Sequence, residues 1–184
     1  MKSPALNRLA ARVCSALRGQ GIDAILTGGS CVAIYSEGKY VTGDMDFVPL
    51  NTHDMARVES ALATVGFKPQ GRVYVNPDEE LVVDIVRPPL AIGSEPVRAV
   101  AFIKAGRYSL KLLTPTDCVK DRLASFYFWN DRRGLEQAML VCLAQKVSAT
   151  AIGRWSRAEG MADRYREFQA ALSTRRRRAR GKPA

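Results

Sequence analysis

The segment 25–48 constrains the fold more than any other part of this sequence. It contains a short apolar run, the turn Gly28-Gly29-Ser30, and two aspartates, Asp44 and Asp46, inside a second apolar run. Side chains two residues apart on a β-strand point to the same face of its sheet. If residues 42–48 form a strand, the two carboxylates lie together on one face, and the apolar residues beside them point into a buried core.

A third acid, Asp84, stands alone in a later apolar run, 81–86. This run and residues 72–75 predict the two strands of a hairpin separated by a polar turn. An ionised carboxylate is rarely left in an apolar strand without a partner, so Asp84 needs one. The sequence leaves two alternatives: a metal ion shared with the first two aspartates, or an ion pair with an arginine such as Arg72 or Arg87.

The remaining pattern predicts an α+β protein. Apolar residues at helical spacing predict helices, and short apolar runs bounded by turn residues predict buried strands. These elements assemble into a mixed β-sheet flanked by helices. Before residue 114 we expect helices at 4–18, 31–35 and 52–65, and strands at 22–27, 42–48, 72–75, 81–86, 97–103 and 108–113.

From Thr114 onward the sequence predicts only helices. The segment Thr114-Pro115-Thr116-Asp117 is typical of a helix start, with threonine as the cap, proline in the first turn and an acid near the positive end of the helix dipole. The predicted helices are 114–129, 131–143, 149–159 and 161–172. We therefore predict a core over 1–113, a C-terminal helical region over 114–174 and a disordered basic tail over 175–184.

Positive charge is concentrated at the C-terminus. The sequence has 28 Lys and Arg against 18 Asp and Glu, a net charge of +10, and six of the basic residues lie among the last ten. A basic run such as 175–180 favours contact with a polyanion, for example RNA, although it equally serves solubility. Both interpretations of the tail stay open.

The composition excludes a zinc site. The four cysteines are widely scattered and His53 is the only histidine, so the ligand spacing of such a site is missing. The cysteines are typical of small apolar side chains in a reducing compartment. No apolar run approaches the roughly 18 residues that a membrane span requires. We expect a cytoplasmic protein without a membrane partner.

Paired acids beside a glycine turn predict phosphate chemistry. Mg²⁺ prefers oxygen ligands and bridges carboxylates to substrate phosphates, so Asp44, Asp46 and Asp84 would hold one or two ions. The Gly-Gly pair lets the backbone approach a phosphate closely, and N–H groups at a helix start donate hydrogen bonds to it, together with the Ser30 hydroxyl. The order of loop, paired acids and single acid therefore predicts a nucleoside triphosphate (NTP) substrate.

These residues resemble the motif of the nucleotidyltransferase superfamily, a Gly-Gly/Ser turn followed by acid-hydrophobic-acid and a third acid on a later strand. The matching segments are Gly28-Gly29-Ser30, Asp44-Met45-Asp46-Phe47 and Val83-Asp84-Ile85. The resemblance covers residues 22–87 and implies the nucleotidyltransferase fold. It implies that Gly28, Gly29 and Ser30 hold the nucleotide phosphates, and that Asp44, Asp46 and Asp84 bind metal and form the catalytic site.

Residues 114–137 resemble the helical region of AbiEii-type toxin nucleotidyltransferases. In that family a lysine and, about three turns later, an aspartate face the site, which implies catalytic roles for Lys120 and Asp131 and a partner toxin or antitoxin protein. The sequence departs from the family's Arg-Asp pair, because Asn130 precedes Asp131. Alternatively, Lys120 is a solvated helix lysine and Asp131 a first-turn acid.

The aromatic run Phe126-Tyr127-Phe128-Trp129 also has two interpretations. Such rings stack nucleobases in many nucleic-acid-binding proteins. Adjacent aromatic residues spread around a helix, however, more often pack in a protein core. Core packing is the prediction that we adopt.

The sequence therefore predicts a Mg²⁺-dependent enzyme that transfers a nucleoside monophosphate from an NTP to an acceptor hydroxyl. The basic balance favours RNA, such as the ends of tRNA, as acceptor, with a protein hydroxyl next and a small molecule third. A second hypothesis is a catalytically silent binding module that keeps the fold and regulates a partner protein. The presence of all three acids disfavours that module.

Overall fold

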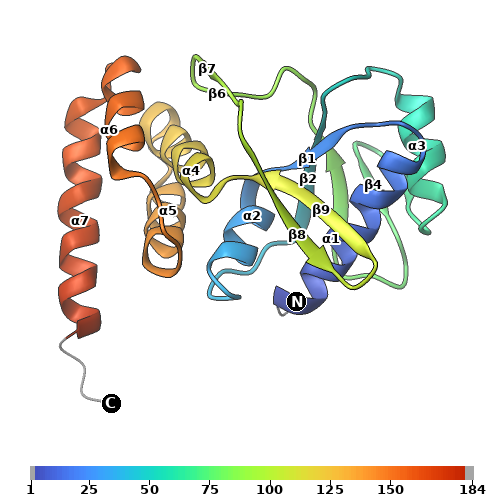
Figure 1. The fold of residues 1–184 in the computed structure, drawn as a ribbon, viewed down its shortest axis with the longest axis horizontal. Helices are drawn as coiled ribbons and strands as arrows, with labels where there is room; N and C mark the ends of the chain where they lie inside the picture. Colours follow the sequence, from blue (N-terminus) through green and yellow to red (C-terminus); the bar gives the residue numbers. More distant parts are fainter. Residues whose placement is uncertain (1–2, 181–184) are drawn as a thin grey trace.

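The computed structural model describes residues 3–180 and has the α+β architecture expected from the sequence (Figure 1). The helices are α1 (Ser3–Gly19), α2 (Gly28–Tyr35), α3 (Met55–Ala63), α4 (Pro115–Trp129), α5 (Arg132–Ala144), α6 (Ala149–Ala158) and α7 (Ala162–Arg180). The strands are β1 (Ala24–Leu26), β2 (Asp44–Pro49), β3 (Lys68–Gln70), β4 (Val73–Val75), β5 (Val82–Ile85), β6 (Ala91–Ile92), β7 (Glu95–Pro96), β8 (Val100–Ala105) and β9 (Tyr108–Leu113).

Seven of the strands form one mixed sheet in the order β3-β4-β5-β2-β1-β9-β8. Strand β2 lies in the middle, parallel to β5 and antiparallel to β1, and β1 is parallel to β9. Strands β6 and β7 form a separate hairpin beside α4. Because helices cover both faces of the central strands, these strands are apolar except where the aspartates lie.

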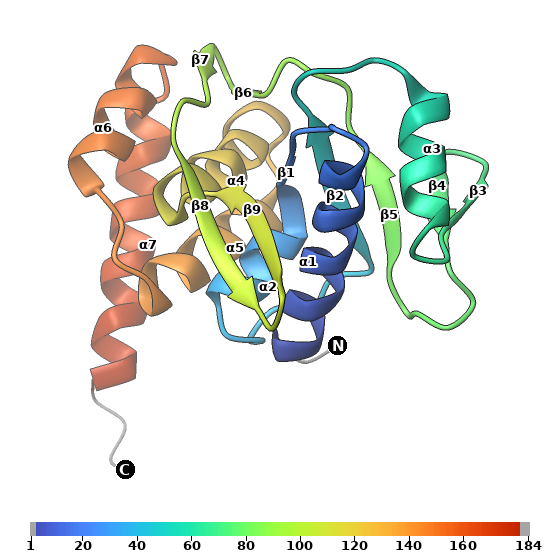
Figure 2. The same ribbon diagram turned by 45° about the vertical axis from the view of Figure 1, so that its right-hand side comes forward.

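The two faces of the sheet pack against different helices. Helices α1 and α3 contact each other on one face, which receives the fully buried side chains of Met45, Phe47 and Val83. Helix α2 packs against β2 from the other face and contacts α4 and α5. Figure 2 shows α1 in front of the central strands and α2 behind them. The aspartates point to the α2 side.

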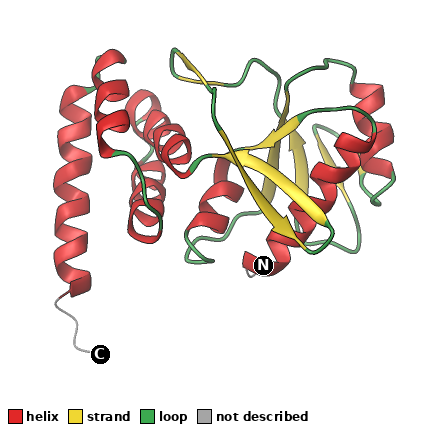
Figure 3. Ribbon diagram, viewed as in Figure 1, coloured by secondary structure: helices red, strands yellow, loops and turns green. Residues whose placement is uncertain are grey.

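The C-terminal helices gather on one side of the sheet, with α7 outermost (Figure 3). Helix α4 begins as the sequence predicts, with the Thr114 hydroxyl accepting a hydrogen bond from the backbone N–H of Asp117. It ends at Asn130, which has a left-handed conformation, and Asp131 then caps α5. Gly134 lets the two helices meet, because a Cβ there would lie 2.6 Å from the carbonyl oxygen of Arg122.

Helix α7 corrects the prediction of a disordered tail for residues 175–180. The helix continues through Arg180, since alanine and arginine favour helix formation. Arg175 forms an ion pair with Glu136 of α5, and Arg176 donates a hydrogen bond to the carbonyl of Cys142. These contacts hold part of the basic run against α5. Residues 181–184 lie outside the described part of the chain.

Three strands and the starts of two helices also differ from expectation. Strands β3, β6 and β7 were not predicted, because they have only two or three residues each and little apolar character. Helix α2 begins at Gly28 instead of residue 31, so the predicted turn 28–30 is its first turn. Helix α3 begins at Met55 instead of residue 52, because Asp54 caps it and accepts a hydrogen bond from the N–H of Arg57. Within residues 3–180, no helix is both long and apolar enough to cross a membrane.

Candidate active site

Three aspartates lie on one face of the sheet. Asp46 of β2 is directly opposite Asp84 in the parallel pair β2–β5, and Asp44 lies two residues earlier on β2. Paired residues of adjacent strands, and residues two apart on one strand, share a face. The structure therefore brings together all three predicted carboxylates. No ion pair joins Asp84 to Arg72 or Arg87 in the described part of the chain, so that alternative is not the observed arrangement.

Gly28, the first residue of α2, lies against the carboxylate of Asp46. Its φ of +65° is in the left-handed region, and a Cβ at this position would lie 1.8 Å from Oδ2 of Asp46. Only glycine avoids both the strain and the clash. Gly28 therefore allows the N-terminus of α2, with its unpaired N–H groups and positive dipole end, to approach the acids.

Ser30 and Thr42 fix the position of Asp44. The Ser30 hydroxyl is fully buried and donates to the backbone carbonyl of Asp44 at 2.6 Å, and Thr42 Oγ1 donates to Asp44 Oδ1 at 2.8 Å. A Cβ at Gly29 would lie 2.8 Å from Thr42 Oγ1. The Ser30 hydroxyl therefore joins α2 to β2, and the groups available to a phosphate are the backbone N–H groups of α2. Sequence reasoning missed Thr42, whose nearness to Asp44 was its only signal.

Burial, together with the neighbouring acids, raises the pKa of the Asp46 carboxyl to about 6. Burial is the largest cause, followed by the negative charges of Asp44 and Asp84, while the positive charge of Arg122 lowers the pKa. A carboxylate in these surroundings gains from any cation that binds beside it. This is an electrostatic reason to expect a positively charged ligand at the three aspartates.

Arg122 of α4 is a residue of the site that sequence reasoning missed. Its guanidinium donates to Asp121 Oδ2 from Nε at 3.0 Å and from Nη2 at 2.5 Å, and from Nη1 to Gln137 Oε1 at 3.4 Å. Burial lowers the pKa of Arg122, but the charge of Asp121 and its hydrogen bond, with smaller contributions from Cys118 and Asp46, outweigh burial and the net shift is upward. A mostly buried, permanently charged guanidinium therefore lies close to the aspartates.

Lys120 and Asp131 are engaged elsewhere. The buried Lys120 ammonium contacts Glu95 Oε1 of β7 at 2.7 Å and Asp117 Oδ1 at 3.3 Å. Asp131 Oδ1 accepts a hydrogen bond from the backbone N–H of Arg133 at 2.9 Å, as the N-cap of α5. The structure does not bring either side chain together with the three aspartates, and their catalytic roles stay a prediction.

The donor set fits Mg²⁺ only in part as it stands. Within residues 3–180, no three or more His, Cys, Asp or Glu side chains gather closely enough to hold a metal ion by themselves. Mg²⁺ usually takes one or two protein carboxylates and completes its octahedron with waters and substrate phosphates. Asp44 and Asp46 lie two residues apart on one strand face and meet that smaller requirement.

The sheet order and the three aspartates at the N-terminus of α2 define a protein with the nucleotidyltransferase fold. The chain is similar to the crystal structure of an antigenic nucleotidyltransferase-like protein from Paracoccidioides brasiliensis, with a TM-score of 0.66, 13% sequence identity and 94% of each chain covered. It is also similar to the aminoglycoside nucleotidyltransferase ANT(2'')-Ia, seen in complex with adenylyl-2''-tobramycin (TM-score 0.51, 13% identity, 91% of this chain and 96% of that one).

A solution structure of ANT(2'')-Ia, described as an antibiotic-resistance factor, gives the same result. Its TM-score is 0.53 at 14% identity, with 97% of this chain and 100% of that chain covered. The sequence itself matches no protein-family model, and no curated protein matches it significantly. The likeness therefore establishes the fold alone, and the AbiEii-type resemblance of 114–137 stays a prediction.

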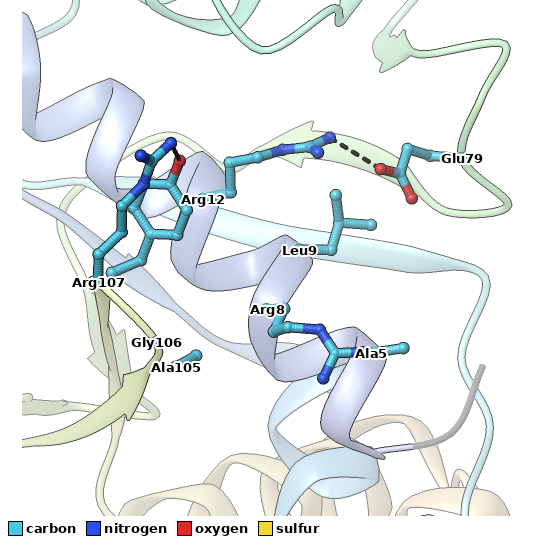
Figure 4. Close-up of a pocket in the computed structure, with 9 residues that line it drawn as sticks. Ala5, Arg8, Leu9, Arg12, Glu79, Ala105, Gly106 and Arg107 are labelled. Atoms are coloured by element: carbon cyan, nitrogen blue, oxygen red, sulfur yellow. Dashed lines mark hydrogen bonds and ion pairs between the residues drawn. The ribbon is translucent and has the colours of Figure 1, made fainter.

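A hollow of about 510 Å³ lies away from the aspartates, between α1 and the β8–β9 turn (Figure 4). Arg8 and Arg12 of α1 line it together with Arg107, and Arg12 pairs with Glu79 at 2.8 Å. Arg107 lies over the Tyr108 ring, with its guanidinium carbon 4.9 Å from the ring centre. None of the predicted site residues lines this hollow, so it is not part of the candidate active site.

Proposed function

We propose that this protein is a Mg²⁺-dependent nucleotidyltransferase that transfers a nucleoside monophosphate from an NTP to an acceptor hydroxyl and releases pyrophosphate. The observation that carries the proposal is the position of Asp44, Asp46 and Asp84 on one sheet face, with Gly28 holding the N-terminus of α2 against Asp46. A helix N-terminus attracts phosphate and carboxylates attract Mg²⁺. The triphosphate and the Mg²⁺ ion of a Mg²⁺–NTP complex would therefore bind next to each other, at the N-terminus of α2 and at the aspartates.

Each residue has a separate task in the proposed reaction. Asp44 and Asp46 would hold Mg²⁺, which when bound would lower the pKa of the attacking hydroxyl and neutralise charge on the leaving pyrophosphate. The N–H groups of α2 bind the triphosphate and orient its α-phosphorus towards the acceptor. The acceptor oxygen bonds to that phosphorus, the bond to the bridging oxygen of the β-phosphate breaks, and Asp84 accepts the hydroxyl proton. Arg122 stabilises the negative charge that builds up on the phosphates.

The proposed acceptor is RNA, a protein hydroxyl or a small molecule, and two of these classes have further support. RNA, including tRNA ends, is our first choice because the chain carries a net charge of +10. Helix α7, which carries the basic run, lies at the far side of the helical region from the sheet (Figure 1), so a long polyanion is needed to contact both. A small polyhydroxyl molecule is the second class, favoured by the fold shared with ANT(2'')-Ia, whose complex holds adenylyl-2''-tobramycin.

The alternative is a catalytically silent module that regulates a partner protein, such as a toxin or antitoxin. A silent module has no need for a carboxyl with a pKa of about 6 among two other acids. Such crowding costs stability and is typical of functional sites. We therefore rank the module below the enzyme.

The test is a transfer assay with the full-length protein. Pure protein is incubated with Mg²⁺, each labelled NTP in turn, and total tRNA, cell lysate proteins or an aminoglycoside mixture. The proposal expects label on one acceptor class, lost in Asp46→Asn and retained in Asp78→Asn, a matched change at an exposed acid of the β4–β5 turn. Equal blanks for both proteins with every acceptor, together with tight binding to a co-purifying protein, would support the module instead.

A further inference from the structure

Two aromatic side chains at the end of α4 are exposed although their neighbours are buried. Phe126 and Tyr127 lie in the core, whereas Phe128 is 42% and Trp129 is 76% exposed. The exposed rings meet edge to face with their centroids 6.0 Å apart. The run therefore divides into a core half and a surface half, and core packing, the prediction from sequence, is correct for the first half only. Exposed aromatic clusters are typical of binding surfaces.

Trp129 lies on the same face of α4 as Arg122. Seven residues make almost two helical turns, so these two side chains line up along α4 about 10 Å apart. Ser125, between them, shares this face and lies beside Gly134 of α5. Lys120 projects from the opposite face, towards Glu95 of β7. The face that carries Trp129 is therefore the face that carries the guanidinium of the candidate active site.

The packing of α2 determines what lies beyond Arg122. At the C-terminal end of α2, the Tyr35 hydroxyl donates to the carbonyl of Leu113, just before α4, at 2.5 Å. Gln145, just after α5, donates to the carbonyl of Tyr35 at 2.9 Å. One turn earlier in α2, Cys31 lies against Cys118 of α4. Helix α2 therefore runs antiparallel to α4, and Gly28 at its other end lies about level with Arg122. The last two turns of α4 extend past the N-terminus of α2.

The surroundings of Trp129 suit an anionic ligand. Arg133, in the first turn of α5, is exposed and makes no ion pair with any residue of the described chain. Arg132 and Arg164 lie over the Phe126 ring at 5.2 and 4.8 Å. Arg132 is ion-paired with Glu167 and Arg164 donates a hydrogen bond to the side chain of Asn130, so Arg133 is the arginine here with no acidic partner in the described chain. Asp131 is the nearest acid in sequence and is engaged as the cap of α5. An aromatic surface bordered by arginines binds a flat, negatively charged molecule well.

We propose that Trp129, supported by Phe128, is the platform on which the base of the NTP stacks while its triphosphate lies at the N-terminus of α2. This inference rests on the nucleotidyl transfer proposed above and adds the residue that holds the base. The offset along α4 matches the extended shape of a nucleotide, with phosphates at Arg122 and the base further along. Because every base has a flat face, such a platform accepts all four NTPs.

The protein contains its own reporter for this test. It has two tryptophans, and Trp155 is 1% exposed, stacked on Tyr127 and hydrogen-bonded through Nε1 to the carbonyl of Ile92. Quenching of tryptophan fluorescence by an added nucleotide therefore reports on Trp129. The full-length protein is titrated with each Mg²⁺–NTP and with Mg²⁺ and inorganic tripolyphosphate, which has the charge and lacks the base. Affinities are also measured by calorimetry.

We expect every NTP to quench fluorescence and to bind more tightly than tripolyphosphate. Trp129→Ala should weaken NTP binding about tenfold, the usual effect of losing one stacking ring, without changing tripolyphosphate binding. Trp129→Phe should restore most of the affinity. Phe102→Ala, which removes an exposed aromatic ring from β8, is the matched control and should behave like wild type.

Three results would overturn the platform. In the first, Trp129→Ala binds NTPs as tightly as wild type, which leaves nucleotidyl transfer intact and removes only this inference. In the second, Trp129→Ala loses tripolyphosphate binding equally, which assigns Trp129 a purely structural role. In the third, the variant loses affinity for a polynucleotide acceptor alone, which assigns the ring to the acceptor. If neither NTP nor tripolyphosphate binds wild type, the proposed function fails and the platform with it.

Discussion

Lys120 and Arg122 lie two residues apart on opposite faces of helix α4, and their surroundings differ. Lys120 is buried between Glu95 and Asp117, so its charge is neutralised within the fold. Arg122 pairs with Asp121 but also lies close enough to Asp46 to lower the pKa of that carboxyl. The comparison teaches that burial and pairing alone do not identify a functional cation. What distinguishes Arg122 from Lys120 is its further electrostatic interaction with Asp46, a carboxylate of the candidate active site.

The largest effect is expected at Asp46 itself. Asp46→Asn removes a carboxylate from the site proposed to hold Mg²⁺, which should lower the transfer rate on the order of 10³-fold, because a bound metal contributes several kcal/mol to the transition state. Single-turnover transfer of labelled NMP measures this loss. An unchanged rate would show that neither Asp46 nor the Arg122 charge near it takes part in the reaction.

Arg122→Met should lower the transfer rate about 10²-fold, which is typical for loss of one group that stabilises developing charge. The same substitution at Lys120 is the matched control and should leave the rate per folded molecule within about twofold. If Lys120→Met lowers the transfer rate more than Arg122→Met does, the proposed difference between the two faces of α4 is wrong. Such a result would favour the catalytic role that the AbiEii-type resemblance implies for Lys120.

The effect of Lys120 should appear in the free energy of unfolding instead of in the transfer rate. Lys120→Met leaves Asp117, whose side chain is only 15% exposed, without its cation, and should lower the free energy of unfolding by about 1 to 3 kcal/mol. Urea unfolding followed by circular dichroism measures this. Glu95→Gln should cost less, because half of the Glu95 side chain is in water. Equal losses for the two variants would contradict the view that Lys120 is a structural residue.

The last prediction concerns the pH dependence of stability. The Asp46 carboxyl has a pKa of about 6 in the folded protein against 3.8 ordinarily, so the folded state binds this proton more tightly than the unfolded state does. Its contribution therefore lowers stability as pH rises from about 4 to 6, and is constant above. Relative to wild type, Asp46→Asn should gain roughly 1 to 3 kcal/mol between pH 4 and pH 7.5. Parallel stability curves would show that Asp46 is not crowded.

The sequence predicted the part of the candidate site that lies on β2 and on the neighbouring strand β5. A period of two placed Asp44 and Asp46 on one face, and Asp84 was conspicuous as the single acid of an apolar strand. Gly28 was found through the turn that it begins. These signals are local, because each depends on residues within one strand or one turn.

Arg122 could not be identified from the sequence. Lys120, Asp121 and Arg122 are consecutive charged residues, and only the packing of α4 against α2 decides which of them faces the aspartates. The basic run 175–180 was misjudged for a related reason. Its helix is held partly by Glu136, an acid 39 residues earlier in the chain, and a pairing at that separation leaves no pattern in the sequence.

The arginines of α7 also affect how the protein has to be handled. We expect a helix with so many positive charges on its exposed side to retain cellular nucleic acid at low ionic strength, and RNA carried over in this way would mask or imitate an acceptor in the transfer assay. Washing at about 1 M salt, where charges are screened beyond roughly 3 Å, removes such material before any substrate is added. The ratio of absorbance at 260 and 280 nm then tells whether a polynucleotide that remains is held by more than charge.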